Sequence, residues 1–406
     1  MKNIKEIDKL ISETQGKAEE IYLFGMSLLG REFAIETSLK IKGVFDNDPL
    51  KWGSLIEGHI VNNPCMIINM NFDNAIIIIT SDYDKSISEQ LQGMANIKWI
   101  SLPYVMQKVD IQTMTDNKSF DIKTVIIETT NHCNAKCKFC VNSTMKRMKT
   151  VMEDDILECI LQRLKNEKFV PDCFRLHLLG EPLIDPQLFE RIDRIKQEFP
   201  NSEIGYTTNF SLATPEIIEK LIASKQTFIV ISLNAINEAE YGKVMGNSSL
   251  SLEKTIQNIE LLVKRCDEED RKLDITISFV EDDVSHDNTQ FFESYWRKKG
   301  IKTRIMKKGE WLNEGIKETT MVVEKNNNKI KHYVCGMLKQ ELCIMSNGDY
   351  ALCCFDSEGI PKMNIRDIEI HEAMVSSEYV KARIALQESQ LNTTICAKCS
   401  FITNRN

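Results

Sequence analysis

The chain has 406 residues, 42% of them hydrophobic and 27% charged, which is the composition of a globular protein and excludes a disordered or fibrous one. At roughly 100–200 residues per domain, this length predicts two or three domains. The 51 basic and 59 acidic side chains give a net charge of −8. This argues against a nucleic-acid partner, because proteins that bind nucleic acids usually carry an excess of basic residues. The first residues lack the apolar stretch of a signal peptide, and no apolar run is long enough to span a bilayer. We therefore expect a cytoplasmic protein with no membrane partner.

Short apolar strands alternate with helical patterns over residues 19–105. The run from Ala75 to Thr80 has the continuous β-branched character of a parallel strand that is buried on both faces. Such alternation predicts a parallel, Rossmann-like sheet, which we expect to form a domain over 1–112. Residues 106–121 are polar and show no strong period, so we predict a linker there. The expected strands are Ile21–Phe24, Gly43–Asp46, Ala75–Thr80 and Ile97–Ser101.

Two glycines and an acid in this first domain fit part of a nucleotide-binding pattern. Gly25 and Gly30 open a helix after the first strand, a geometry that suits a phosphate at a helix N-terminus. Asp46 follows at about the distance where an acid meets a ribose hydroxyl, although the full G-x-G-x-x-G pattern is absent. The run Val44–Pro49, with the glycines after it, resembles small Rossmann-like domains attached to sugar-modifying and sugar-nucleotide enzymes. Nucleotide or sugar binding and a structural or docking role both remain open for this domain.

A second strand-and-helix series begins near residue 120. Its six βα units predict an open or partial (β/α)6 barrel over 120–310, since a full barrel of this kind needs eight. The remaining segment, 331–406, is short and cysteine-rich, and it contains one hairpin signal around Ser346–Asp349. We therefore expect a small C-terminal domain over 331–406. The expected barrel strands are Thr124–Glu128, Phe174–Leu178, Glu203–Thr207, Phe228–Leu233, Asp274–Val280 and Lys302–Met306.

The 13 cysteines are the unusual feature of the composition. In a reducing compartment they indicate metal binding or catalysis rather than disulfides. Four are scattered singly and are expected to be buried thiols, namely Cys65, Cys159, Cys173 and Cys266. The other nine form three groups, which are Cys133, Cys137 and Cys140; then Cys335, Cys343, Cys353 and Cys354; then Cys396 and Cys399.

The first group lies directly after the first barrel strand, in the segment Thr130–Cys140 with spacing C-x3-C-x2-C. Three thiolates hold one face of an iron–sulfur cube and leave one iron open for a small ligand, whereas a structural cube or a zinc site takes four ligands. A chance cluster or a partial zinc site is the alternative. The position of this loop favours a catalytic role over these alternatives, because barrel active sites form at the carboxyl ends of the strands.

This loop resembles the signature of the radical S-adenosylmethionine (radical SAM) superfamily, and the resemblance extends over about 120–406. It implies a 4Fe–4S cluster on Cys133, Cys137 and Cys140 whose open iron is chelated by S-adenosylmethionine. Leu179–Pro182 looks like the family's GEP motif, which meets the methionine amino group; Thr207–Asn209 and Ser232–Asn234 look like its later strand-end elements, the second one near the ribose. The implied cofactor-binding residues are Phe139, Gly180, Glu181, Pro182, Thr208, Asn209, Ser232 and Asn234.

The C-terminal cysteines resemble the auxiliary-cluster module called SPASM or, in its shorter form, twitch. The resemblance implies a second 4Fe–4S cluster with no open iron, held by Cys335, Cys353, Cys396 and Cys399. A four-cysteine zinc ribbon is the alternative, and one ligand position could instead belong to Cys343 or Cys354. Cys354 is also the candidate catalytic residue, as a donor of a hydrogen atom to a substrate radical; a structural role is the alternative.

The resemblance implies an enzyme that splits S-adenosylmethionine with one electron from an external donor, such as flavodoxin or ferredoxin, and abstracts hydrogen from an unreactive C–H bond. Family members with this module act on sugars and aminocyclitols or on peptides and proteins. The sugar-type N-terminal domain favours a carbohydrate, aminocyclitol or sugar-nucleotide substrate, with oxidation ahead of epimerisation. A peptide- or protein-modifying maturase is the first alternative, and a non-enzymatic zinc-ribbon scaffold is the distant one.

Overall fold

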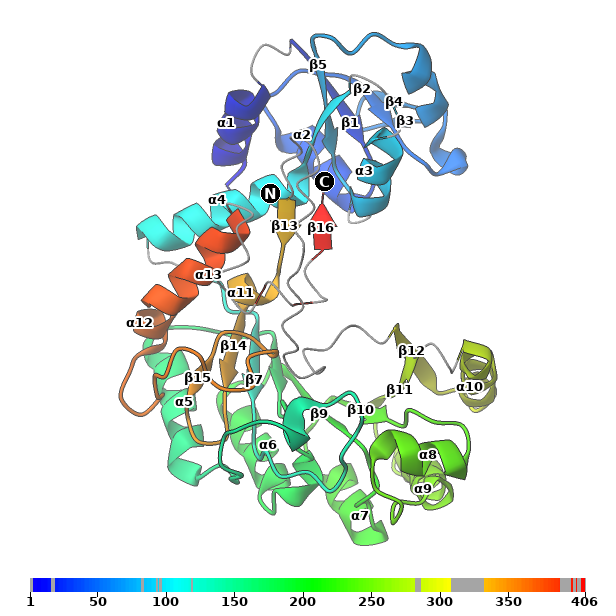
Figure 1. Ribbon diagram of the computed structural model, residues 1–406, viewed down its shortest axis with the longest axis vertical. Helices are drawn as coiled ribbons and strands as arrows, with labels where there is room; N and C mark the ends of the chain where they lie inside the picture. The colour runs from blue at the N-terminus through cyan, green and yellow to red at the C-terminus, as the bar shows by residue number, and fades with distance from the viewer. Residues whose placement is uncertain are drawn as a thin grey trace.

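The computed structural model describes residues 3–15, 19–81, 84–92, 94, 97–117, 120–281, 286–307, 332–387, 396, 399 and 403–405. Figure 1 shows two sheets at opposite ends of the molecule, with the helices α4 and α13 between them. This is the α/β organisation expected from the sequence, with a Rossmann-like sheet, a partial barrel and a small cysteine-rich C-terminal part.

The N-terminal sheet has the order β3-β4-β2-β1-β5-β6. All its pairings are parallel except that of β3 with β4. Strand β5, which lies between β1 and β6, is buried along its whole length, which fits the continuous run of isoleucines. The strands are β1 (Glu20–Phe24), β2 (Ile41–Phe45), β3 (Leu55–Ile56), β4 (His59–Asn62), β5 (Ala75–Ile79) and β6 (Lys98–Ser101); the helices are α1 (Ile4–Gln15), α2 (Leu28–Glu36) and α3 (Asp84–Gln92).

The second sheet has the order β12-β11-β10-β9-β8-β7-β14-β15. Its six consecutive strands β7 to β12 are parallel, as a partial barrel requires. The strands are β7 (Thr124–Ile127), β8 (Cys173–Arg175), β9 (Glu203–Thr208), β10 (Phe228–Ser232), β11 (Asp274–Glu281) and β12 (Lys302–Lys307). The helices are α5 (Asp154–Asn166), α6 (Leu188–Glu198), α7 (Pro215–Ala223), α8 (Glu238–Met245), α9 (Leu252–Glu268) and α10 (His286–Lys298).

The C-terminal hairpin is continuous with the barrel sheet. β14 (Glu341–Ile344) pairs in parallel with β7 and antiparallel with β15 (Tyr350–Ala351). Leu342 and Ile344 are fully buried in the same hydrophobic core as the barrel helices. The cysteine-rich part is therefore attached to the barrel through a strand ladder. Its other elements are β13 (His332–Val334), α11 (Met337–Gln340), α12 (Ile370–Met374), α13 (Ser377–Gln387) and β16 (Thr403–Arg405).

The linker predicted over residues 106–121 is wrong, because α4 (Leu102–Asn117) occupies most of that segment. Leu102, Val105 and Val109 are buried in the N-terminal core at helical spacing. Two of these three apolar positions precede residue 106, where the polar segment begins. The helical spacing of apolar residues therefore cannot be recognised within residues 106–121 alone. The helix packs against both α1 and α13, and it crosses the domain boundary expected at residue 112.

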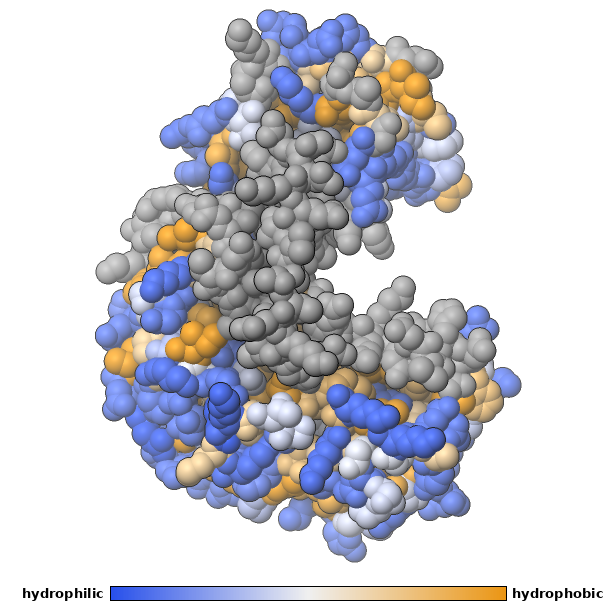
Figure 2. Space-filling model, viewed as in Figure 1, coloured by the Kyte–Doolittle hydropathy of each residue, from blue (hydrophilic) through white to orange (hydrophobic). Residues whose placement is uncertain are grey.

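The surface of the described residues is that of an ordinary globular fold. No helix among them combines the length and the apolar character needed to cross a bilayer. The face in Figure 2 shows hydrophilic residues with apolar ones scattered between them, which is normal for a protein surface.

The continuity of the hairpin with the barrel core gives a stability prediction. Leu342→Ala should lower the free energy of unfolding by about 2–5 kcal/mol, because it removes a fully buried side chain from the shared core. The control is Leu55→Ala in β3, whose leucine is 71% exposed, and it should change stability by less than about 0.5 kcal/mol. Urea unfolding monitored by circular dichroism measures both; equal effects would contradict a shared core.

Candidate functional site

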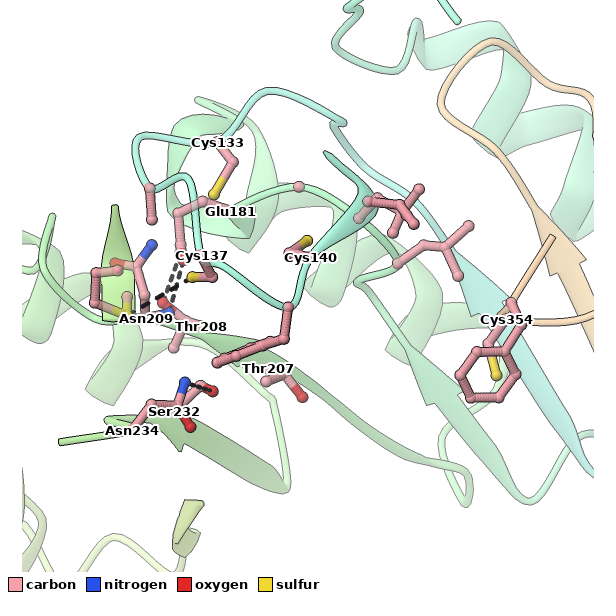
Figure 3. Close-up of a pocket in the computed structure, with 18 residues that line it drawn as sticks. Cys133, Cys137, Cys140, Glu181, Thr207, Thr208, Asn209, Ser232, Asn234 and Cys354 are labelled. Atoms are coloured by element: carbon pink, nitrogen blue, oxygen red, sulfur yellow. Dashed lines mark hydrogen bonds between the residues drawn. The ribbon is translucent and has the colours of Figure 1, made fainter. Parts of the chain in front are cut away.

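A cavity opens at the carboxyl ends of β7, β8, β9 and β10. It brings together residues from segments that lie far apart in the sequence, including the cluster loop and the segment after the C-terminal hairpin (Figure 3). Its lining residues are Cys133, Ala135, Cys137, Phe139, Cys140, Val141, Leu178, Leu179, Gly180, Glu181, Thr207, Thr208, Asn209, Ser232, Asn234, Met245, Cys354 and Phe355.

The end of α8 holds the cluster loop in place. The backbone N–H of Lys136 donates to the carbonyl of Met245 at 2.8 Å. Gly246 ends the helix with a φ of +61°, and a Cβ there would lie 2.0 Å from the Lys136 carbonyl oxygen, so only glycine fits. The Sδ of Met245 lies 3.7 Å from the Sγ of Cys137. The loop is thus anchored at its middle by a helix terminus.

The three thiols of the loop fit an iron–sulfur cluster in their chemistry and placement. Cys133, Cys137 and Cys140 form no disulfide bond, and all three line the same cavity. Burial raises the pKa of Cys133 to about 11 and that of Cys137 to about 12, and each thiol is also affected by the charge of Cys140. Iron binds thiolates, so loading of the site must release these protons.

Glu181 is the buried acid of the cavity, with 2% of its surface exposed. Its carboxylate accepts hydrogen bonds from the Thr208 hydroxyl at 2.5 Å and from the Asn209 backbone N–H at 2.7 Å. Burial nevertheless raises the pKa of Glu181 to about 7. The Thr-Asn element at the end of β9 therefore positions the acid of the Gly-Glu-Pro turn, and this acid suits a cationic ligand group.

The Gly-Glu-Pro turn lies directly against the cluster loop. A Cβ at Gly180 would lie 1.9 Å from the carbonyl oxygen of Thr130, and the Glu181 N–H donates to the His132 carbonyl at 2.8 Å. Pro182 is buried at the start of a short helical turn and is not among the residues that line the cavity. Its position fits a role in shaping the turn rather than in touching a ligand.

Ser232 and Asn234 lie at the end of β10 and line the cavity. The side-chain N–H of Asn234 donates to the Ser232 hydroxyl at 2.9 Å, and its oxygen accepts the Val280 N–H at 3.0 Å. Asn234 has a φ of +53°, a conformation that asparagine tolerates better than most residues. These bonds fix both side chains at the mouth of the barrel.

Cys354 lines the same cavity, on the side opposite Glu181 and Asn209 (Figure 3). Burial, followed by the charges of Glu341, Cys335 and Cys399, raises the pKa of the Cys354 thiol to about 12. It is therefore close to the C-terminal cysteines as well as to the cavity.

The four cysteines predicted to hold an auxiliary cluster affect one another's protonation in part. Burial is the main cause that raises the pKa of Cys353 well above its ordinary value, and the thiols of Cys335 and Cys396 contribute. The pKa of Cys335 is raised in turn by burial and by Cys399. Their thiolate chemistry fits an iron–sulfur site, although their ligand roles stay a prediction. Cys343, in strand β14 of the hairpin, is fully buried.

Sequence reasoning missed Met245, which lines the cavity and comes from a helix without a motif. Thr207 belongs to a strand-end element expected from the sequence, and two 3.1 Å contacts with the ring of His177 fix it. Asn134 is not among the residues that line the cavity, but it accepts a hydrogen bond from Asn209 at 2.9 Å and so joins the cluster loop to β9. A sequence signal was present for Asn134, which lies between the first two cysteines of the loop.

The residues of the partial nucleotide-binding pattern in the N-terminal domain make contacts within the domain itself. The Asp46 carboxylate accepts the backbone N–H groups of Met26 at 2.7 Å and Asp48 at 2.8 Å, and it pairs with the Lys51 ammonium at 3.0 Å. A Cβ at Gly30 would lie 2.0 Å from the Gly25 carbonyl oxygen. These contacts support the structural interpretation of the two glycines and the acid.

Two family models match the chain. One, described as the radical SAM superfamily, matches residues 127–283, and the other, SPASM, an iron–sulfur cluster-binding domain, matches residues 335–400. Together they contain the residues that line the cavity and the C-terminal cysteines.

Two curated proteins are similar over part of the chain. A GTP 3′,8-cyclase of Microcystis aeruginosa is 31% identical over 125 residues, 30% of this chain and 37% of that protein. A tungsten-containing aldehyde ferredoxin oxidoreductase cofactor-modifying protein of Pyrococcus furiosus is 24% identical over 145 residues, 35% of this chain and 39% of that protein. The chain thus spans less than two-fifths of the length of either relative.

One of the solved structures that the chain resembles in part is anSMEcpe with bound AdoMet, at a TM-score of 0.48 and 16% identity over 66% of this chain and 88% of that one. Another is BtrN in complex with AdoMet and 2-DOIA, at a TM-score of 0.44 and 14% identity over 70% of this chain and 93% of that one.

The two groups of thiols predict two clusters that can be removed separately. Anaerobically reconstituted protein should hold roughly eight irons with matching sulfide, as two cubes. Replacing Cys133, Cys137 and Cys140 by alanine should remove about half of this iron and abolish cleavage of S-adenosylmethionine, since the open iron is lost. Iron and sulfide analysis tests this. Zinc in place of iron at the C-terminal site would refute the auxiliary cluster.

The buried acid predicts a pH-dependent affinity for S-adenosylmethionine. Because Glu181 has a pKa near 7, it is anionic above this pH and neutral below it, and only the anion attracts the methionine ammonium. Affinity should therefore rise as pH rises through about 7. Glu181→Ala should weaken binding roughly 10- to 100-fold and flatten this profile while both clusters are kept. Calorimetric titration measures it, and unchanged affinity would remove Glu181 from the site.

Proposed function

The chain belongs to the radical SAM superfamily and carries a SPASM domain, and from this premise we propose that it oxidises a hydroxyl-bearing carbon of a small carbohydrate-like molecule. Its cofactors are S-adenosylmethionine, the 4Fe–4S cluster that binds it and auxiliary iron–sulfur. The observation that carries the proposal is the convergence of the loop thiols, Glu181 and Cys354 on one cavity.

Residues of the cavity would hold the cofactors in fixed roles. Cys133, Cys137 and Cys140 would ligate the cluster, and Glu181 would take the methionine ammonium. Ser232 and Asn234 would meet the ribose. When bound, cluster and S-adenosylmethionine supply a 5′-deoxyadenosyl radical that removes a hydrogen atom from an unreactive C–H bond.

The protein itself orients the ligands and excludes water from the reacting atoms. Thr208 and Asn209 hold the Glu181 carboxylate in place, and Gly180 allows this turn to touch the cluster loop. The apolar lining from Ala135, Leu178 and Met245 limits solvent at the cavity.

Oxidation needs an electron acceptor close to the substrate carbon. A carbon radical that carries a hydroxyl group becomes a carbonyl when it loses one electron and the hydroxyl proton. The proposed acceptor is an auxiliary cluster that Cys335, Cys353, Cys396 and Cys399 would hold, and Cys353 directly precedes Cys354, which lines the cavity. The proton passes to solvent. An external donor such as flavodoxin or ferredoxin would supply the starting electron.

The substrate class is a carbohydrate, aminocyclitol or sugar nucleotide. The support is the N-terminal Rossmann-like sheet, which resembles domains attached to sugar-modifying enzymes. A peptide- or protein-modifying maturase is the competing substrate class, and assays must therefore include peptides.

Epimerisation is the second candidate outcome, favoured by one observation. The Cys354 side chain lines the cavity, so its thiol is placed to return a hydrogen atom to the other face of the carbon. No electron leaves the substrate in that case. The sulfur radical left on Cys354 would return to the thiol by taking one electron from the external donor and one proton from solvent.

Deuterium labelling distinguishes these outcomes. Pooled sugar nucleotides, aminocyclitols and peptides are assayed anaerobically, and the substrate is identified by transfer of its deuterium into 5′-deoxyadenosine. Oxidation predicts a new carbonyl, no solvent deuterium on carbon, and product from the Cys354→Ala variant. A product without a carbonyl that gains one solvent deuterium, together with loss of product but not of 5′-deoxyadenosine in Cys354→Ala, would establish epimerisation instead.

A further inference from the structure

A buried ion pair lies between the cluster loop and the C-terminal hairpin. Both guanidinium nitrogens Nη1 and Nη2 of Arg147 donate to the carboxylate of Glu128 at 2.9 Å. The two side chains are 7% and 0% exposed. Glu128 follows β7, and Arg147 follows the cluster loop, so the pair fixes the two ends of the segment that carries Cys133, Cys137 and Cys140.

The same pair also binds the C-terminal part of the chain. Glu128 accepts the backbone N–H of Ser346 at 3.0 Å and its hydroxyl at 2.9 Å. The Nε of Arg147 donates to the carbonyl of Ser357 at 2.6 Å. Next to this, the backbone N–H of Lys146 donates to the Glu358 carboxylate at 3.0 Å. Each of the three guanidinium nitrogens of Arg147 therefore donates one hydrogen bond.

The segment held by Arg147 is itself rigid. Asp356 is 2% exposed, and its carboxylate accepts the backbone N–H groups of Leu352 at 3.0 Å and Ile360 at 2.8 Å. These bonds close a turn over residues 352–360. Cys353 and Cys354 lie inside this turn, so a bond to Ser357 fixes the position of both cysteines relative to the barrel.

The energetics favour a positional role for the pair. Removing two charges from water costs several kcal/mol per ion, and well-packed apolar residues often stabilise a fold as well as or better than a buried ion pair does. Apolar contacts are not directional, whereas hydrogen bonds are. The hydrogen bonds of Arg147 and Glu128 join the strand, the cluster loop, the hairpin and the turn in a fixed geometry. Position, more than stability, is what such a pair supplies here.

We propose that Arg147 and Glu128 are positioning residues that set the separation between the two iron–sulfur sites and hold Cys354 at the cavity wall. The inference rests on the two-cluster assignment above. It predicts that loss of the pair displaces the turn over 352–360 while the loop thiols keep their own cluster.

The test compares reconstituted variants by electron paramagnetic resonance with both clusters reduced, because the magnetic interaction between them depends on their separation. Arg147→Met alone leaves the Glu128 carboxylate buried without its cationic partner, so the main variant is Glu128→Gln with Arg147→Met. Arg147→Lys keeps the charge but not the fork. Arg366→Met is the matched control, since Arg366 also ties the C-terminal part to the barrel, through Asp155 and Glu153 on the outer side.

In the double variant, the magnetic interaction between the two clusters should be lost or broadened, or the C-terminal iron alone should be lost. Arg147→Lys should show the same change to a smaller extent. Arg366→Met should resemble wild type. An unchanged interaction in the double variant would overturn the proposal. Loss of both clusters from the double variant and from Arg147→Lys would also overturn it, because the pair would then act only in stability. If wild type holds no second cluster, the functional assignment fails instead, which iron analysis of wild type alone reveals.

Discussion

The parallel pairing of β14 with β7 is the constraint on which the rest of the site depends. It places a strand from the cysteine-rich part beside the strand that leads into the cluster loop, with Cys343 opposite Ile126 and Ile344 opposite Ile127. The chain can then turn back through β15, so that Cys354 arrives at the cavity. A strand ladder fixes direction and register together, which makes it a precise way to join two metal-binding segments.

The buried polar groups of the site receive hydrogen bonds from both backbone and side-chain donors. Glu181 gains bonds from Thr208 and Asn209, yet burial still raises its pKa to about 7. The loop thiols are likewise shifted toward the protonated form by burial. Both effects favour the protonated forms, so binding of a metal to the thiolates and of a cationic group to the carboxylate would release protons. Binding and proton release are therefore coupled in this cavity.

Much of the fold follows from periodicity, and its failures have local causes. The isoleucine run of β5 and the amphipathic helices α5 and α9 carry their burial in their own spacing. The helix α4 was missed because its buried residues Leu102 and Val105 precede the polar window that suggested a linker. Strand β8 is shorter than expected and ends at Arg175, since the following residues leave the ladder to form the turn that carries Glu181.

The sequence by itself determined the chemistry: the spacing of Cys133, Cys137 and Cys140, the acid in the Gly-Glu-Pro turn and the strand-end positions of Ser232 and Asn234 are local patterns. Only the tertiary structure decided which distant residues join them. Met245, Thr207 and Cys354 line the cavity, whereas Pro182 does not, and the carboxylate of Asp46 is occupied by its own loop. The reason is that ligand spacing along one loop is set by covalent geometry, whereas contacts between segments are set by strand register and helix packing, which no single segment encodes.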